Sequence, residues 1–122
     1  MVTEPVLIRD ELQMSIDCIA RLVGALQARQ LSDEQHADVQ GMMAGVDQLQ
    51  HVMQNFSDFT TQTDEQLSEL RHDLLNGLNL VGGFAFVLIQ GFDEGVSVDE
   101  LDIARQIHRH AKECVIIVRK II

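Results

Sequence analysis

A short apolar segment contains the side chains best suited to chemistry. In "ELRHDLLNGLNLVGGFAFVL" (residues 69–88), His72 is followed directly by Asp73 and, four positions later, by Asn76. A neutral imidazole beside a carboxylate is a poised nucleophile, because the acid can orient the ring and accept its proton. The three residues therefore predict covalent chemistry at the histidine.

The helical period places this group on the outer side of a helix. At 100° per residue, His72 lies about 200° from the leucines two positions before and after it, which mark the apolar side. Asn76 is only about 40° from His72, Asn79 and Gly83 continue the same line, and Asp73 lies at its edge, close enough to contact the imidazole region. We expect an exposed stripe of small and amide side chains that another protein can approach.

The other histidines form no comparable group. His108 and His110 are spaced by two, so they point to different faces of a helix and cannot chelate a metal ion as an i, i+4 pair would. His36 and His51 have no partner in the sequence. We predict that all four are structural or surface residues, and that the chain holds no metal and no cofactor.

Composition and charge exclude several classes of function. The 122-residue chain carries 19 acids against 9 Lys and Arg, a net charge of −10, which argues against binding to nucleic acid or to anionic lipid. No apolar run reaches the about 20 residues of a transmembrane helix, and no signal peptide opens the chain. Cys18 and Cys114 lack CxxC spacing and are expected to be reduced, semi-buried thiols. These features predict a cytoplasmic protein without membrane contact.

Apolar residues at steps of three and four predict four helices and no strand. The first runs from about 6 to 30, and turns are expected near 30–33, 57–64 and 91–97. Capping boxes mark the starts of the other three helices, at Ser32 with Gln35, Thr63 with Gln66, and Ser97 with Glu100. The predicted core residues of the fourth helix are Leu101, Ala104, Ile107, Ala111, Val115, Val118 and Ile122.

These helices predict an all-α fold with one domain over residues 1–122. Two helical hairpins, 6–60 and 64–122, should close into an antiparallel four-helix bundle, because a lone hairpin cannot bury its apolar stripe. The hairpins can be laid over each other with "IRDEL" on "LRHDL", which puts Asp10 at the place of His72. Duplication and coincidence both explain this alignment, and in either case the first hairpin is a degenerate scaffold.

The segment from His72 onward resembles the H-box of the dimerisation and histidine phosphotransfer (DHp) domain of sensor histidine kinases. That motif has His, an acidic residue, Leu, a variable residue, Asn or Thr, Pro, Leu, often Asn, and later Gly-Phe-Ala before Leu. With the following loop and helix, the match extends over about 64–122. Two features depart from the family: its proline is Gly77 here, which permits a bend without enforcing one, and nothing resembles the ATP-binding domain that follows in kinases. The residues that fit are His72, Asp73, Leu74, Asn76, Leu78, Asn79, Gly83, Phe84, Ala85 and Leu88.

The resemblance implies roles for individual residues. His72 would be the phosphoacceptor and Asp73 the acid or base that activates it. Asn76 would position a water for removing phosphate from a partner's aspartate. Without an ATP-binding domain, the chain alone is expected to have no kinase activity. The implied partner surface consists of Arg71, Leu75, Asn79 and Gly83.

On this basis we predict a histidine phosphotransfer protein of bacterial two-component signalling. It would exchange phosphate between His72 and the aspartate of a response-regulator receiver domain, or bind a sensor histidine kinase. Two alternatives stay open: a non-catalytic DHp-like protein that binds and inhibits a kinase or receiver, and a fragment of a sensor histidine kinase. The sequence also leaves open the direction of phosphoryl flow and whether the chain is a monomer or a homodimer.

Overall fold

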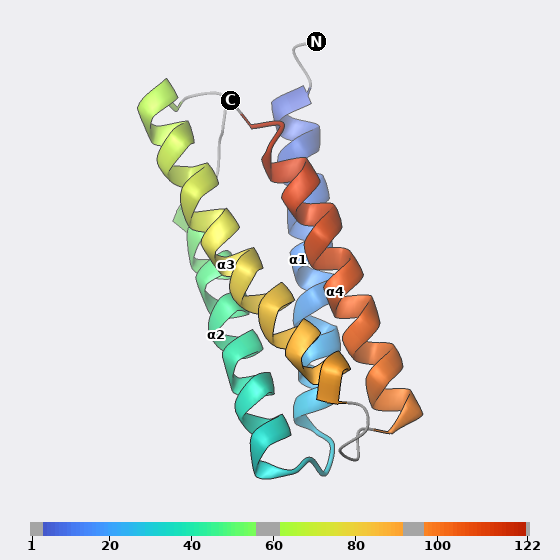
Figure 1. The fold of residues 1–122 in the computed structure, drawn as a ribbon. Helices are drawn as coiled ribbons and strands as arrows, with labels where there is room; N and C mark the ends of the chain where they lie inside the picture. The colour runs from blue at the N-terminus through green and yellow to red at the C-terminus, as the bar shows by residue number, and fades with distance from the viewer. Residues whose placement is uncertain (1–3, 56–61, 92–96, 122) are drawn as a thin grey trace.

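Four long helices make up the computed structural model, which describes residues 4–55, 62–91 and 97–121. No strand occurs in those three ranges. The helices form an antiparallel four-helix bundle, which confirms the predicted fold class (Figure 1). They are α1 (Glu4–Gln27), α2 (Asp33–Asn55), α3 (Asp64–Gln90) and α4 (Val98–Val118).

Reciprocal capping bonds fix where α2, α3 and α4 begin. The hydroxyl of Thr63 accepts from the backbone N–H of Gln66 at 3.1 Å, and the Gln66 side chain accepts from the Thr63 N–H at 2.9 Å. The pairs at Ser32 and Ser97 are built in the same way, so all three predicted capping boxes are confirmed. Helix α1 ends at Gln27, a little earlier than expected. The expected turns at 57–64 and 91–97 lie largely outside the described residues.

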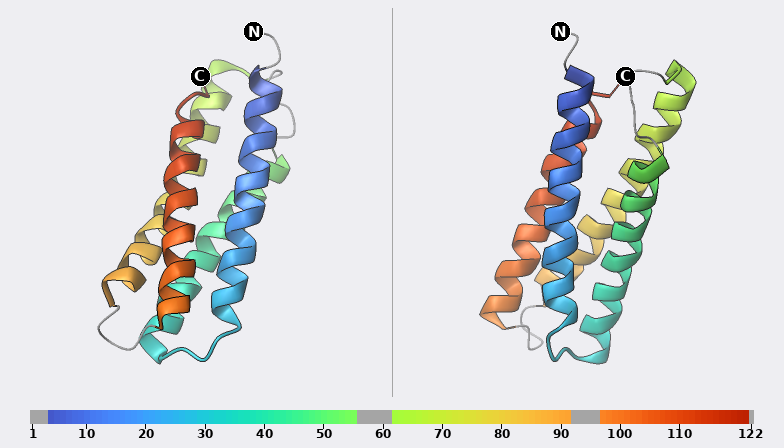
Figure 2. Two further views of the ribbon diagram at one scale, coloured as in Figure 1. Left: turned by 90° about the vertical axis from the view of Figure 1, so that its right-hand side faces the viewer. Right: turned by 180° about the vertical axis from the view of Figure 1, so that it is seen from behind.

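The helices follow one another around the bundle, so each packs against its two neighbours in the chain and α4 closes the ring against α1 (Figures 1 and 2). Their apolar faces meet in one buried core. The predicted core of α4 is wrong at one position: Val115 is half-buried, and Cys114 is fully buried instead. Ile122 lies outside the described residues, while Ile121 is buried.

Two glycines allow α2 and α3 to approach closely. A Cβ atom at Gly77 would lie 2.9 Å from the Leu49 side chain, and one at Gly45 would lie 2.8 Å from the carbonyl oxygen of Gly77. The glycine at the family's proline position therefore has a packing reason of its own. Gly82 and Gly83 differ from these two glycines, since a Cβ at Gly82 makes only ordinary contact and one at Gly83 meets nothing within 4 Å.

In the described part of the chain, α3 is the one helix long and apolar enough to cross a membrane. Core helices of soluble proteins can have the same length and composition, so this property does not distinguish a membrane-spanning helix from a core helix. The apolar composition of α3 leaves its outer face with little charge. From Leu74 to Gln90, the helix has no Asp, Glu, Lys or Arg.

Candidate functional site

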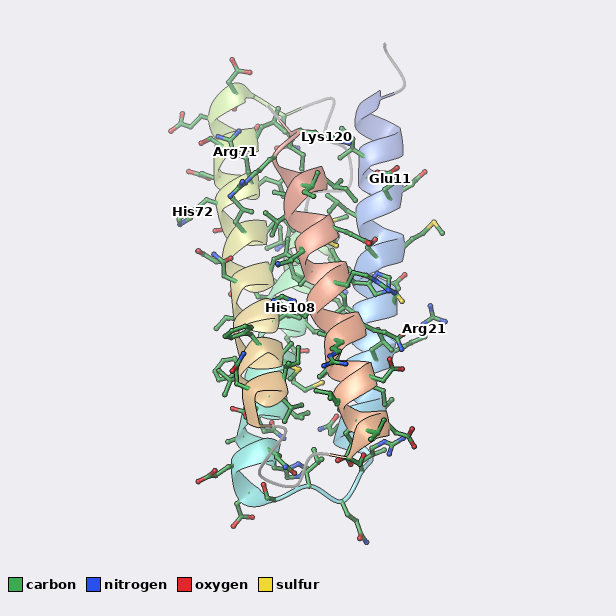
Figure 3. The ribbon with its side chains drawn as sticks, turned by 45° about the vertical axis from the view of Figure 1, so that its right-hand side comes forward. Glu11, Arg21, Arg71, His72, His108 and Lys120 are labelled. Carbon is green, nitrogen blue, oxygen red and sulfur yellow. The ribbon has the colours of Figure 1, made fainter. Side chains whose placement is uncertain are left out.

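His72 projects from the outer face of α3 into solvent, as the helical period predicts (Figure 3). Its Nε2 atom lies 3.3 Å from Nδ2 of Asn76, which is also exposed and lies one turn further along the helix. When the amide donates this hydrogen bond, Nε2 carries the lone pair and the ring proton resides on Nδ1. In this arrangement the Asn76 amide occupies one of the two ring nitrogens of His72.

Asp73 is less exposed than His72 and Asn76. Its side chain is half-buried, and its backbone carbonyl accepts a hydrogen bond from Nε2 of Gln48 on α2 at 3.0 Å. Within the described residues, the Asp73 carboxylate makes no hydrogen bond and no ion pair, so the expected contact with the imidazole is absent. Activation of His72 by this acid would need a hydrogen bond that the two side chains do not make in this structure.

Arg71 and Leu75 lie on the side of α3 toward its neighbours. The Arg71 guanidinium donates to the carbonyl oxygen of Ile121 at 3.0 Å, so this side chain ties α3 to the chain just after α4. Leu75 is half-buried and packs against the core. Of the predicted partner-contacting residues, these two already have structural contacts within the bundle.

Asn79 and Gly83 are exposed and line a groove between α3 and α4. The groove has a volume of about 320 Å³ and begins two turns beyond His72. From α4, His108 faces it, with its ring 6.0 Å from the ring of Phe86. Partial burial lowers the pKa of His108, and the positive charge of Lys112 adds to this effect. The groove is lined by Leu78, Asn79, Gly82, Gly83, Phe86, His108, Ala111, Lys112 and Val115.

The outer face of α3 beyond His72 is apolar as well as uncharged. Phe86 and Val87 are 49% and 51% exposed, and Leu80 is also exposed. These three side chains are the exposed large apolar residues of α3.

A larger hollow of about 630 Å³ lies at the far end of α3, against the first turns of α2. Its acidic side chains, Asp33, Glu34 and Asp38, would repel a phosphoryl group. Burial raises the pKa of Asp38, and the neighbouring Glu34 raises it further. This hollow adds nothing to the site at His72.

Sequence reasoning missed a second pair with the geometry of the first. His51 on α2 is exposed, and its Nε2 atom lies 3.0 Å from Nδ2 of Asn55, four residues later. The prediction that His51 has no partner is therefore wrong. The signal was available, because "HVMQN" and "HDLLN" share the same spacing of histidine and asparagine.

No group of three or more His, Cys, Asp or Glu side chains in the described ranges is arranged to hold a metal ion. Comparison with known proteins finds no matching family model, no matching curated protein and no matching solved structure. The H-box resemblance therefore depends on the sequence of this chain alone.

Proposed function

We propose that this chain is a histidine phosphotransfer protein that carries a phosphoryl group on His72. The observation that supports this most directly is the position of the imidazole. It stands in solvent on the outer face of α3, with an amide one turn away and an uncharged surface beyond it. A phosphodonor can approach this ring without displacing a core side chain.

A receiver domain is the proposed partner. It would cover the groove between α3 and α4, where Asn79 and Gly83 leave room and Phe86 offers apolar contact. Docking there would bring an aspartyl phosphate over His72, two turns away. Positioning of this kind accounts for much of the catalysis in phosphoryl transfer, and the partner supplies its own charge stabilisation.

The proposed transfer exchanges one bond to phosphorus for another. A ring nitrogen of neutral His72 attacks the phosphorus atom, the nitrogen–phosphorus bond forms, and the bond to the partner's aspartate oxygen breaks. The aspartate leaves as a carboxylate, and the ring gives its remaining proton to solvent. If Nε2 is the attacking atom, the Asn76 amide must first release it.

Transfer from phosphorylated partners tests this proposal. The chain would be incubated with a panel of receivers and sensor kinases carrying labelled phosphate, and the products examined for acid-labile, base-stable phosphate. We expect label on one histidine, mapped by mass spectrometry to His72. Label at His51, His108 or His110 would contradict the proposal, as would the absence of transfer from every partner.

The exposed apolar side chains also favour a second candidate, a protein that docks on a kinase or receiver and blocks it. Phe86 and Val87 would serve such docking without any chemistry at His72. Inhibition that survives His72→Ala would favour this function over phosphotransfer.

A further inference from the structure

A second group of reactive side chains lies where α1 packs against α4, on helices that run side by side (Figure 2). Sγ of Cys18 on α1 is 3.5 Å from Nε2 of His110 on α4. The other ring nitrogen, Nδ1, is 3.7 Å from a carboxylate oxygen of Glu113. A thiol, an imidazole and a carboxylate thus stand in series, the order in which a base activates a nucleophile and an acid orients the base.

His110 is incompletely bonded in this arrangement. Its Nδ1 atom is buried and has no hydrogen-bond partner among the residues that the structure describes, although Glu113 lies just beyond bonding distance. When Nε2 accepts a proton from Cys18, Nδ1 carries the other ring hydrogen, and this hydrogen lies on the side of the Glu113 carboxylate. Glu113 is therefore the nearest acidic group to the second ring nitrogen of His110.

The two cysteines of the chain differ in their surroundings. Cys18 is partly exposed, whereas Cys114 is fully buried. Burial raises the pKa of Cys114 to about 11, partly offset by a hydrogen bond with Ser15 and reinforced by Glu113 and Cys18. Only a thiolate attacks electrophiles, so Cys114 is an internal example of an inert thiol.

The surroundings of Cys18 limit the class of co-reactant. Acyl transfer needs hydrogen-bond donors for an oxyanion, but the backbone N–H groups around Cys18 lie in the interior of α1 and bond within the helix. Neither of the hollows at α3 reaches Cys18. Cys18 and Glu113 contact opposite nitrogens of the His110 ring and cannot share one metal ion. A small oxidant needs none of these features.

We propose that Cys18 is a redox-active thiol that a hydroperoxide oxidises to a sulfenic acid, with His110 as its proton acceptor. The thiol proton passes to Nε2 of His110, and the thiolate attacks one peroxide oxygen. The sulfur–oxygen bond forms and the oxygen–oxygen bond breaks, so that sulfur is oxidised and the peroxide is reduced. The leaving oxygen takes the proton from His110 and departs as water or an alcohol. Glu113 is a positioning residue that holds the imidazolium between these steps. This proposal is independent of the chemistry at His72.

Trapping with dimedone, which reacts with sulfenic acids, tests the proposal. The wild-type chain and Cys114→Ala would be treated with hydrogen peroxide and dimedone, and the adduct located by peptide mass spectrometry. We expect the adduct on Cys18 in both proteins. His110→Gln should slow its formation about tenfold or more, because less thiolate forms. Glu113→Gln should slow it less, by about threefold, because the carboxylate acts through the histidine.

Matched variants separate activation from folding. His108→Gln changes a histidine on the same helix that faces the groove instead of Cys18, and should leave the rate unchanged. Glu113 is about half exposed, so Glu113→Gln tests the contact of the carboxylate with His110 without disturbing the core. The proposal would be overturned by an adduct first on Cys114, by no adduct on Cys18 in Cys114→Ala, or by equal rates in His110→Gln, Glu113→Gln and wild type.

Discussion

Helices α2 and α3 each carry an exposed histidine whose Nε2 lies close to the amide of the asparagine four residues on. The two pairs have nearly the same internal geometry, at 3.0 Å for His51 with Asn55 and 3.3 Å for His72 with Asn76. A spacing of four on a helix is sufficient to produce such a contact. The pair alone therefore does not define a site, and the surroundings must account for any difference in function.

Those surroundings differ along the chain. His51 lies in the last turn of α2, and Asn55 is the final residue of that helix. His72 lies well inside α3, and the helix continues beyond it with small, amide and apolar side chains and no charge as far as Gln90. In the described residues, the pair on α3 leads into a groove that has a wall from a second helix, α4. We attribute the predicted function of His72 to this continuous surface.

Removing each imidazole tests the comparison most strongly. We expect His72→Ala to abolish phosphorylation by a cognate partner, while His51→Ala retains it in full. Both side chains are exposed, so neither change should alter the fold appreciably. Acid-labile label measured by electrophoresis, with circular dichroism as the folding control, gives the result. Equal loss in both variants, or in neither, would remove the distinction between the two pairs.

The acid beside His72 provides the next largest expected effect. Asp73→Asn should slow transfer by about 10²-fold, at the lower end of what general acid–base catalysis contributes. Asp47, an exposed acid one turn before His51, supplies the control Asp47→Asn, which should have no effect. Rapid-quench kinetics of transfer from a phosphorylated receiver would measure both rates. Asp73 makes no hydrogen bond with the imidazole in the free chain. An unchanged rate would therefore mean that Asp73 has no part in transfer and serves only the packing of α2 against α3.

The two amides should differ in the removal of phosphate. Asn76→Ala should retain phosphorylation of His72 but slow dephosphorylation of the receiver, by about tenfold, because the amide that orients the attacking water is lost. Asn55→Ala should leave both steps unchanged. The half-life of the receiver's aspartyl phosphate, with and without each variant, reports the effect. If Asn76→Ala abolished phosphorylation altogether, the amide would be needed to hold the His72 imidazole, and its proposed role in orienting the water would be wrong.

The fold could be predicted from the sequence because its determinants are local. Capping boxes and apolar spacing act within one or two turns, so the sequence predicts the starts of α2, α3 and α4 at the residues where the structure has them. The exposure of His72 follows from the same period. Features that depend on which helices face each other could not be predicted from local sequence. One example is the close approach of Gly45 to Gly77. The contact of Cys18 with His110 joins residues far apart in the chain and has no local signal.

Errors at the edge of a stripe have a different origin. Cys114 and Val115 lie three and four residues after buried Ala111, and both steps continue a helical apolar face. The neighbouring helix decides between them, and here it covers the cysteine. Asp73 makes no hydrogen bond or ion pair with His72 for a different reason, since residues adjacent in a helix point about 100° apart.

The glycines of the two helices provide the smallest and last test, which asks whether the small residues beyond His72 serve folding. Gly83→Ala adds a Cβ with nothing within 4 Å and should stabilise the fold by about 0.5–1 kcal/mol, because alanine loses less backbone entropy in a helix. Gly45→Ala on the inner face of α2 places its Cβ 2.7 Å from Val81 and 2.8 Å from the Gly77 backbone, and should destabilise it by about 1–3 kcal/mol. Urea denaturation would measure both changes in the free energy of unfolding, provided that its dependence on urea concentration is the same in each variant. A stable Gly83→Ala chain that binds its partner more weakly would mean that glycine at 83 is retained for the approach of another protein, at a cost in stability that the fold does not require. A destabilised Gly83→Ala chain would instead mean that Gly83 is needed for the folding of the bundle. In that case Gly83 would no longer distinguish the surroundings of His72 from those of His51.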